Sequence, residues 1–385
     1  MRAIIATIFL LVFLYWPIPS HSTMLQSEES PKLSNLLTRD EFISRLSMES
    51  CEKSPDRIYI DTNNSDFDLA HAYSFSWLAL QTLDVITGSF EDDPDADLIK
   101  AEEQWNLKDI KMIESKPWQV KAMIAEYQDV VLLTFRHTDS NLNWLFNADY
   151  GLWNFEHSFT LGQKVHHGFG SMLGAIWEET TSEIRSRTAY SDKPVYVFGH
   201  SLGGAMALLA AAGLSVEGVR LAQVYVTGVP KVAGRDWQIQ AESQLNAVPI
   251  YRVTNSQDLF ARVPVSNYAL DEFREMFSFV PDFLANLIGN TRSQMEFGVI
   301  GEHALMTDSH QLVKSSAMDS ELNEPLYWLN LAEQFSNIDQ NATNIFENIT
   351  QKFAILSENL KRHLMRKPEN GYTCSMIQLL KSESK

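Results

Sequence analysis

The pentapeptide Gly199-His200-Ser201-Leu202-Gly203 contains the residues best suited to carry out chemistry. A β-branched and aromatic run, Val195–Phe198, leads into it, and a stretch rich in Ala and Leu follows. A serine flanked in this way sits in a strained turn between strand and helix, where its hydroxyl can act as a nucleophile. The alternative, a glycine-rich helix cap with a capping serine, requires neither flanking glycine. Ser201 is therefore the candidate nucleophile.

A serine nucleophile needs a base, and the base needs a carboxylate that orients it, here in the chain order Ser, Asp, His. Asp258 is the candidate acid, because it follows the strand-like run Ile250–Val253, and parallel strands present functional groups at their carboxyl ends. Asp236 and Asp271 are rivals on the predicted periphery of the sheet. For both of them a solvated surface acid is the simpler interpretation.

Two downstream histidines are candidates for the base, His303 and His310. His310 follows a polar turn and precedes a predicted helix, so a loop could carry it back to the serine. His303 ends an apolar strand-like run and is more easily a structural histidine. The sequence favours His310. Three upstream histidines do not fit the chain order, namely His137, His166 and His167.

The negative oxygen that forms during attack on a carbonyl requires two N–H donors. Leu202 follows the nucleophile and supplies one, and Thr138, in a loop after a predicted strand, suits the other. The adjoining segment 139–147 gathers four apolar residues among polar ones, and it is expected to act as a lid whose apolar face contacts lipid. A core helix is the alternative. The four residues are Leu142, Trp144, Leu145 and Phe146.

Strand-like and helix-like segments alternate around these residues. Alternation of this kind predicts a mostly parallel central sheet flanked by helices. The predicted strands are 120–124, 129–135, 195–198, 222–227 and 250–253, and the predicted helices are 69–83, 170–186 and 202–213. Residues 266–292 form an apolar insertion, and apolar residues recur from 322 to 364 with a period close to 3.5, which predicts one or two long helices with a break near 339–341.

The N-terminal region combines a short apolar leader with a polar segment. Residues 1–22 have the layout of a secretory signal peptide: Arg2, about 14 apolar residues, and then two prolines. That run is too short for a membrane anchor of about 20 residues. Residues 23–66 are expected to form a poorly packed lead-in. Two cysteines, Cys51 and Cys374, would permit one disulfide in an exported protein.

The composition and charge narrow the classes of function. Of 385 residues, 45% are hydrophobic and 21% are charged, as in ordinary globular proteins, which excludes a largely disordered or collagenous chain. The net charge of −18 would repel a nucleic-acid backbone, so no nucleic-acid partner is expected. The oligomeric state cannot be predicted from the sequence.

Several motifs taken together resemble the class 3 (fungal-type) lipase family. They are the Gly199–Gly203 turn, the Phe135-Arg136-His137-Thr138 loop, Asn143-Trp144, Val165–Phe169, Thr227–Gly234 and Asn255-x-x-Asp258 followed by Val263-Pro264. The resemblance implies an α/β-hydrolase fold over residues 67–318. Residues 319–385, which the apolar period predicts to be helical, are a C-terminal extension without a counterpart in the family pattern. The resemblance also implies a Ser201, Asp258 and His310 triad, an oxyanion hole from Thr138 and Leu202, and a lid at 139–147.

By this resemblance the chain is expected to be a secreted serine hydrolase that cleaves acylglycerol esters at a lipid interface through an acyl-enzyme on Ser201. Such chemistry needs no metal or organic cofactor, and neither a Cys/His ligand pattern nor a phosphate-binding loop is visible. The alternatives are a phospholipase A1 or galactolipase of the same mechanism, and a catalytically inactive lipid-binding module.

Overall fold

The structure is a computed structural model of the whole chain, and its description covers most residues from 37 onward. The described residues are 37–51, 53–87, 101–136, 152–263, 297–316, 324–341, 347, 348, 351, 354, 355, 358, 362–366 and 371–383. The chain divides into two units, Met1–Leu37 and Thr38–Lys385, and everything below concerns the second. The predicted leader, residues 1–22, lies outside the described residues.

An eight-stranded sheet forms the centre of this unit, in the order β1-β2-β3-β6-β7-β9-β11-β12. The five strands from β3 to β11 run parallel, and the pairs at both ends are antiparallel. This arrangement confirms the predicted mostly parallel sheet. The strands are β1 (Lys108–Ser115), β2 (Val120–Tyr127), β3 (Val130–Phe135), β6 (Val195–His200), β7 (Leu221–Thr227), β9 (Ile250–Asn255), β11 (Glu302–Met306) and β12 (Leu312–Ser315).

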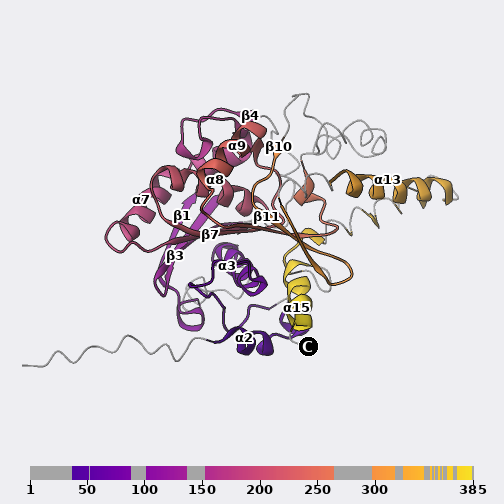
Figure 1. Cartoon of the computed structure of the whole chain (residues 1–385), viewed down its shortest axis with the longest axis horizontal. Coiled ribbons are helices and arrows are strands. Elements are labelled where there is room, and N and C mark those ends of the chain that lie inside the picture. The colour runs from indigo at the N-terminus through magenta and orange to yellow at the C-terminus, as the bar shows by residue number, and fades with distance from the viewer. Residues whose placement is uncertain are drawn as a thin grey trace, which may run out of the picture. The chain divides into compact units, whose positions relative to one another are not determined.

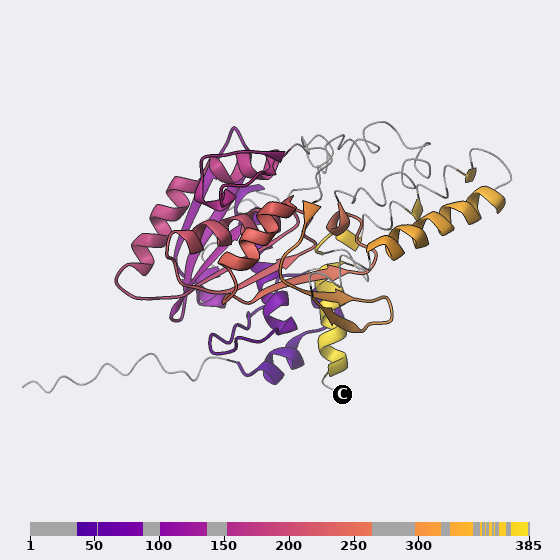
Figure 2. The same cartoon turned by 45° about the horizontal axis from the view of Figure 1, so that its top comes forward.

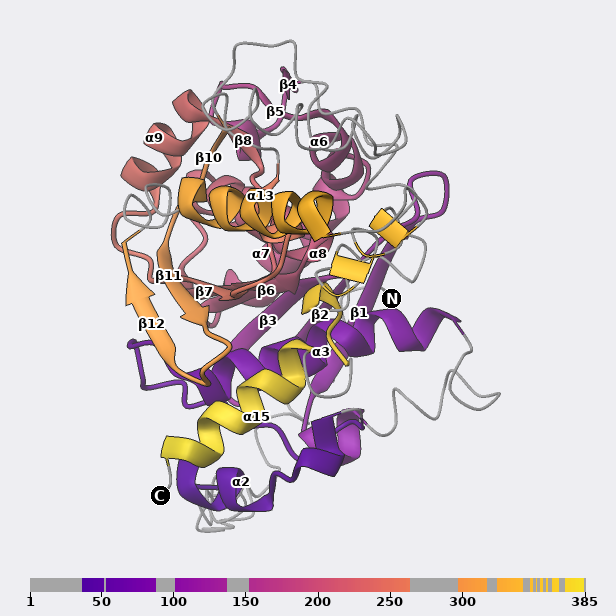
Figure 3. The ribbon, with the colours of Figure 1, turned by 90° about the vertical axis from the view of Figure 1, so that its right-hand side faces the viewer.

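Helices cover both faces of the sheet (Figure 1). On one face lie α7 (Trp177–Thr188), α8 (Leu202–Val216) and α9 (Arg235–Gln244), and on the other lie α2 (Arg39–Arg45), α3 (Leu69–Thr87) and α15 (Tyr372–Glu383). Figure 2 shows α13 (Glu324–Asn341) projecting beyond the sheet, and Figure 3 shows α15 crossing near α3. The predicted helical flanks are therefore confirmed.

The centre of the core is apolar on both sides of the sheet. Every residue of β3 and β6 is buried, as is every residue of α8 from Leu202 to Leu214. Strands covered on both faces read as continuous apolar runs, which is why these segments were recognisable in the sequence. Small residues in α8 let it lie close to β6 and β7, so the helix that follows the candidate nucleophile is rigidly placed.

The predicted helix 170–186 is divided into α6 (His167–Gly174) and α7, with the break at Ala175 and Ile176. A small second sheet packs nearby, in the order β10-β8-β5-β4. Its strands are β4 (Leu152–Trp153), β5 (Val165–His166), β8 (Ala233–Gly234) and β10 (Phe297–Gly298), and the short 3₁₀ helices are η2 (Met48–Cys51), η3 (Ser158–Thr160) and η4 (Phe260–Arg262).

The segment after β11 differs from the prediction. His310 was expected before a helix, but residues 312–315 form β12, which pairs antiparallel with β11. His310 lies in the hairpin turn, with a positive φ of 52°, and its backbone N–H donates to the carbonyl of Thr307. A polar turn followed by Leu312 and Val313 is compatible with a hairpin as well as with the start of a helix. The pairing of this segment with β11 decides in favour of the hairpin.

The predicted lead-in is packed from Thr38 onward. Phe42 and Ile43 of α2 are buried, and Thr38 caps this helix with Glu41 in a capping box. Cys51 forms a disulfide with Cys374 of α15, as the cysteine count allowed. The bridge joins positions 323 residues apart, so the two ends of the described chain are fastened to each other.

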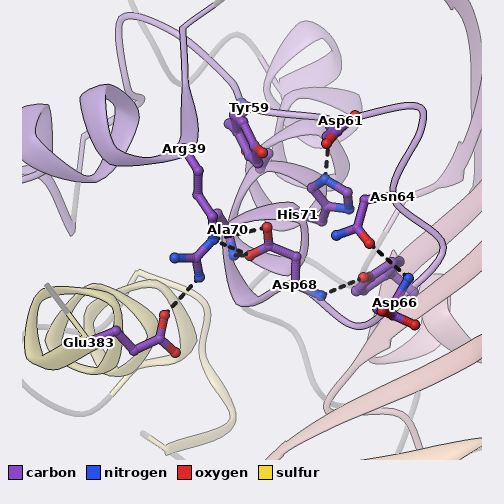
Figure 4. Close-up of polar contacts among 11 residues, drawn as sticks. Arg39, Tyr59, Asp61, Asn64, Asp66, Asp68, Ala70, His71 and Glu383 are labelled. Atoms are coloured by element: carbon purple, nitrogen blue, oxygen red, sulfur yellow. Dashed lines mark hydrogen bonds and ion pairs between the residues drawn. The ribbon is translucent and has the colours of Figure 1, made fainter.

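A polar cluster fixes the same region to the start of α3 (Figure 4). Arg39 lies between two carboxylates: its Nε is 3.0 Å from Asp68, and its Nη2 is 2.7 Å from Glu383 of α15. Asp68 is buried, and it also caps α3 by accepting from the N–H of Ala70. Beside it, the Nε2 of buried His71 accepts a hydrogen bond from the backbone N–H of Asp61 at 2.9 Å.

Acid is expected to loosen this cluster. Burial lowers the pKa of His71, against the opposing charges of Asp68 and Asp61, while Arg39 lowers it further. Because the pKa of His71 is lower in the folded protein than in the unfolded chain, the unfolded chain binds a proton at a higher pH. The stability that neutral His71 contributes is therefore full above about pH 6.5, and it is lost as the pH falls below that value. One proton gives at most about 1.4 kcal/mol per pH unit. The free energy of unfolding is measured with urea at pH 7 and at pH 5. Between these two conditions it should fall less for His71→Gln than for the wild type.

His303 is expected to contribute to the pH dependence of stability in the wild type and in the His71 variant alike. Burial, followed by the charges of Arg252 and Arg262, lowers the pKa of His303 well below its usual range, so His303 contributes acid sensitivity of the same sign. Some pH dependence should therefore persist in His71→Gln. If the variant and the wild type lose equal stability, His71 does not titrate on unfolding.

Candidate active site

Ser201 stands at the turn between β6 and α8 with φ 53° and ψ −121°. A non-glycine residue seldom adopts this conformation, and it persists here because the flanking elements hold it. The Ser201 N–H donates to the carbonyl of Thr227 at 2.9 Å, while its carbonyl accepts from Ala205 at 3.0 Å. The hydroxyl makes no capping bond to α8. The strained turn predicted from the sequence is present, and its serine is not a helix cap.

Both flanking glycines are required by close backbone contacts. A Cβ at Gly199 would lie 2.4 Å from the backbone carbonyl of Gly203, and a Cβ at Gly203 would lie 2.2 Å from the carbonyl oxygen of Phe135. Neither neighbour is a flexible side-chain end, so neither can yield. The end of β3 is thereby held directly against the first turn of α8, beside Ser201.

The hydroxyl of Ser201 contacts His363, whose Nε2 is 2.7 Å from the serine Oγ. The Nδ1 of the same ring lies 3.0 Å and 2.9 Å from the two carboxylate oxygens of Asp258. All three side chains are buried, and the ring of Phe260 packs 4.6 Å from the imidazole. A hydroxyl, an imidazole and a carboxylate in this order can transfer a proton from the serine as it attacks.

Asp258 is held by four donors. Besides His363, the N–H groups of Phe260 and Ala261 donate to its Oδ1 at 2.8 Å and 3.4 Å. The hydroxyl of Tyr372 donates to its Oδ2 at 2.6 Å. Burial and the negative charge of Asp258 raise the pKa of Tyr372 well above its usual range, so this hydroxyl stays protonated and remains a donor. These contacts fix the carboxylate and leave it able to orient the imidazole.

The structure does not bring His310 to this centre. Its side chain is exposed in the β11–β12 turn, and His363 occupies the position expected for the base. His303 is buried within β11, in keeping with a structural histidine. Asp236 is exposed in the first turn of α9, and Asp271 lies outside the described residues.

His363 is a third histidine downstream of Ser201, and it satisfies the same chain order as His303 and His310. It lies 105 residues after Asp258 and within the segment interpreted as one buried helical stripe. Two features of the sequence could have singled out His363. It lies close to Cys374 along the chain, and an aromatic residue, Tyr372, lies between the two. Both signals depend on the C-terminal segment folding back onto the site.

Leu202 is the first residue of α8, directly after the serine. The first N–H groups of an α-helix have no acceptor within the helix, and its dipole favours negative charge there. Thr138 and the four apolar residues of the expected lid, Leu142, Trp144, Leu145 and Phe146, lie outside the described residues. The described chain that leads to Thr138 runs beside the turn, because a Cβ at Gly203 would also lie 3.1 Å from the carbonyl of Arg136.

Removing the Tyr372 hydroxyl should impair the site while leaving the fold in place. A hydrogen bond to a charged group is worth about 1.5–3 kcal/mol, so Tyr372→Phe should lower kcat roughly tenfold or more on a soluble ester, with KM little changed. Tyr73→Phe is the matched control, because Tyr73 is equally buried but lies in α3, where its ring meets that of Trp77 edge to face. Equal kcat values for the two variants would show that the Tyr372 hydroxyl is not needed.

No group of three or more histidine, cysteine or acidic side chains in the described ranges is arranged to hold a metal ion. Among the same residues, no helix has the length and hydropathy to cross a lipid bilayer.

Residues 132–268 match the family described as lipase (class 3). A lipase of Rhizomucor miehei is 29% identical over 175 residues, which cover 44% of this chain and 47% of that protein. A phospholipase A(1) of Arabidopsis thaliana, DAD1, is 26% identical over 225 residues, covering 53% of this chain and 49% of that one. The chain thus matches about half the length of these relatives. A solved triacylglyceride lipase of Rhizomucor miehei has a TM-score of 0.47 and 23% identity, over 63% of this chain and 81% of that chain.

Proposed function

We propose that this chain, whose residues 132–268 match the class 3 lipase family, is a member of that family and hydrolyses carboxylic esters of acyl lipids through an acyl-enzyme on Ser201. The observation that carries the proposal is the continuous contact from Ser201 through His363 to Asp258. His363 takes the hydroxyl proton as the serine attacks the ester carbonyl, and it returns the proton to the leaving alcohol. A water activated by the same imidazole then releases the fatty acid.

Negative charge develops on the carbonyl oxygen during both steps. The N–H of Leu202, at the N-terminus of α8, supports the assignment of one oxyanion donor. Thr138 is proposed as the second donor, because β3 ends against the turn that carries the serine. Stabilisation of this kind is usually worth about 10²–10³ in kcat for each donor.

The substrate is proposed to be an acylglycerol presented at a lipid surface, which the lipase relative supports. A phospholipase A1-type hydrolysis is the second candidate, which the similarity to DAD1 favours. Both use the same catalytic residues and differ in the head group that is accepted.

We place the protein outside the cytoplasm, where structural disulfides persist. The bridge between Cys51 and Cys374 and the leader-like residues 1–22 support this location.

The decisive experiment compares head groups. The protein and its Ser201→Ala variant are assayed on a triacylglycerol emulsion, on phosphatidylcholine vesicles and on a soluble p-nitrophenyl ester, with labelling of Ser201 by a fluorophosphonate measured in parallel. We expect serine-dependent release of fatty acid from the emulsion. Release from the vesicles alone would favour the phospholipase. Absence of both turnover and labelling would overturn the proposed hydrolysis and favour the alternative of an inactive lipid-binding module.

The segment 139–147 is proposed as an interfacial lid. Trp144→Ser should then lower activity on the emulsion about tenfold while changing hydrolysis of the soluble ester less than twofold, because only the emulsion requires the apolar side chain at the lipid surface. An equal loss on both substrates would identify Trp144 as a core residue.

A further inference from the structure

Asp308, in the turn between β11 and β12, accepts hydrogen bonds from two separate segments of the active site. From the first segment, Ser256 Oγ donates to its Oδ1 at 3.0 Å and Gln257 Nε2 donates to its Oδ2 at 2.5 Å. From the second, Arg362 Nη1 lies 2.6 Å from Oδ1. The first two residues directly precede Asp258 along the chain, and Arg362 directly precedes His363.

A link between these two segments matters because they are far apart along the chain. Asp258 follows the end of β9, whereas His363 lies 105 residues later, at the end of a helical segment and just before a turn at Met365 and Arg366. The imidazole must stay within hydrogen-bonding distance of both partners, and a displacement of about 1 Å can cost on the order of 100-fold in rate. The position of Arg362 therefore bears directly on that of His363.

The hairpin turn is itself well fixed. The N–H of Thr307 donates to the carbonyl of Gln311 at 2.9 Å, and the N–H of Ser256 donates to the carbonyl of Met306 at 2.9 Å. The carboxylate of Asp308 is thus presented from a turn that is already bonded to the strand end carrying the acid. Arg362 is mostly covered, with 18% of its side chain exposed, so its guanidinium is held rather than freely rotating in solvent.

We infer that Asp308 is a positioning residue, which joins the segment of the triad acid to the segment of the triad base through Arg362. This inference rests on the proposed function, since it assigns His363 as the base. The side chain of Asp308 contacts Ser256, Gln257 and Arg362, so it acts on the triad through these neighbours.

An effect on kcat without an effect on stability would distinguish a positioning role of Asp308 from a purely structural one. The side chain of Asp308 is 47% exposed, and exposed ion pairs usually contribute little to stability. Its loss should therefore leave the melting temperature nearly unchanged, whereas kcat should fall if the pair aligns the imidazole. The separation of these two readouts tests the inference.

The test uses the full chain, a soluble p-nitrophenyl ester and active sites counted by fluorophosphonate labelling. Asp308→Ala should lower kcat about tenfold with KM within twofold of the wild type, and Asp308→Glu should recover part of that loss. Arg362→Ala should cause a similar loss, and the double variant should lose about as much as either single variant, because the residues share one interaction.

Glu358→Gln is the matched control. Glu358 is a second acidic neighbour of Arg362, at 3.8 Å from its Nε and four residues earlier in the chain. Because Asp308 joins the side chain of Arg362 to Ser256 and Gln257 of the acid segment, and Glu358 does not contact them, the Glu358 variant should keep kcat within twofold of the wild type.

The outcomes separate the two proposals. A wild type that neither labels nor hydrolyses overturns the proposed function. A wild type that is active, beside an Asp308→Ala variant with unchanged kcat, overturns the positioning role alone. Additive losses from Asp308→Ala and Arg362→Ala would also overturn it, because the two residues would then act independently.

Discussion

Replacing His363 with alanine is expected to lower kcat by about 10⁴-fold or more on any ester that the protein hydrolyses. The Nε2 of this histidine is 2.7 Å from the Ser201 hydroxyl. Without it, the serine keeps its proton at neutral pH and attacks slowly. The measurement is kcat on a p-nitrophenyl ester, with the rate of fluorophosphonate labelling of Ser201 as a second readout that should fall in parallel.

The matched control is His310→Asn. Asparagine tolerates the positive φ of 52° at this position, so the hairpin turn that also carries Asp308 is preserved. This variant should keep kcat within twofold of the wild type. A protein inactivated by His310→Asn but active as His363→Ala would return the role of base to His310.

Removing the disulfide is expected to have the largest effect on stability. The bridge between Cys51 and Cys374 closes a loop of 323 residues, and loss of a native bridge usually costs about 2–5 kcal/mol. The double variant Cys51→Ser/Cys374→Ser should unfold at a lower temperature by roughly 3–7 °C. Differential scanning calorimetry measures this shift directly.

Reduction of the wild-type disulfide provides a comparison with the serine double variant. Both cysteines are buried, with 3% and 0% of their surface exposed, so reduction of the native wild type should be slow and should accelerate under partly denaturing conditions. Once reduced, the wild type should melt close to the serine double variant, which should itself be insensitive to the reagent. Equal melting temperatures for oxidised protein and double variant would show that the bridge contributes no net stability.

The sequence is informative wherever structure is decided locally. The central strands β3 and β6 and the helix α8 are continuous apolar segments, and the Gly199–Gly203 turn has its own spacing, so all of them could be predicted. Asp258 could also be predicted, because the carboxyl end of a parallel strand is a defined place in such a sheet.

The base could not be placed in the same way. His363 reaches Ser201 because the C-terminal segment folds back, fastened by the disulfide at Cys374, by the Tyr372 hydroxyl and by the pair between Arg362 and Asp308. Each of these contacts joins residues far apart along the chain. The apolar period through Leu364 predicted one or two long helices with a single buried stripe, yet Leu364 is 40% exposed and the segment turns directly after His363. The polar turn before His310 and the helix expected after it therefore favoured that histidine in the sequence.

The place of Tyr372 in the chain has a consequence for the timing of synthesis. The backbone N–H groups of Tyr372 and Thr373 hold the segment after His363 through the carbonyls of Leu364 and Met365, at 3.1 Å and 3.0 Å. Every strand of the central sheet, and the turn that carries Ser201, comes before His363 and Tyr372 in the chain. During synthesis the sheet and the strained serine turn can therefore form before the residues that complete the contact with Ser201 are made, and we expect that contact to form late in folding.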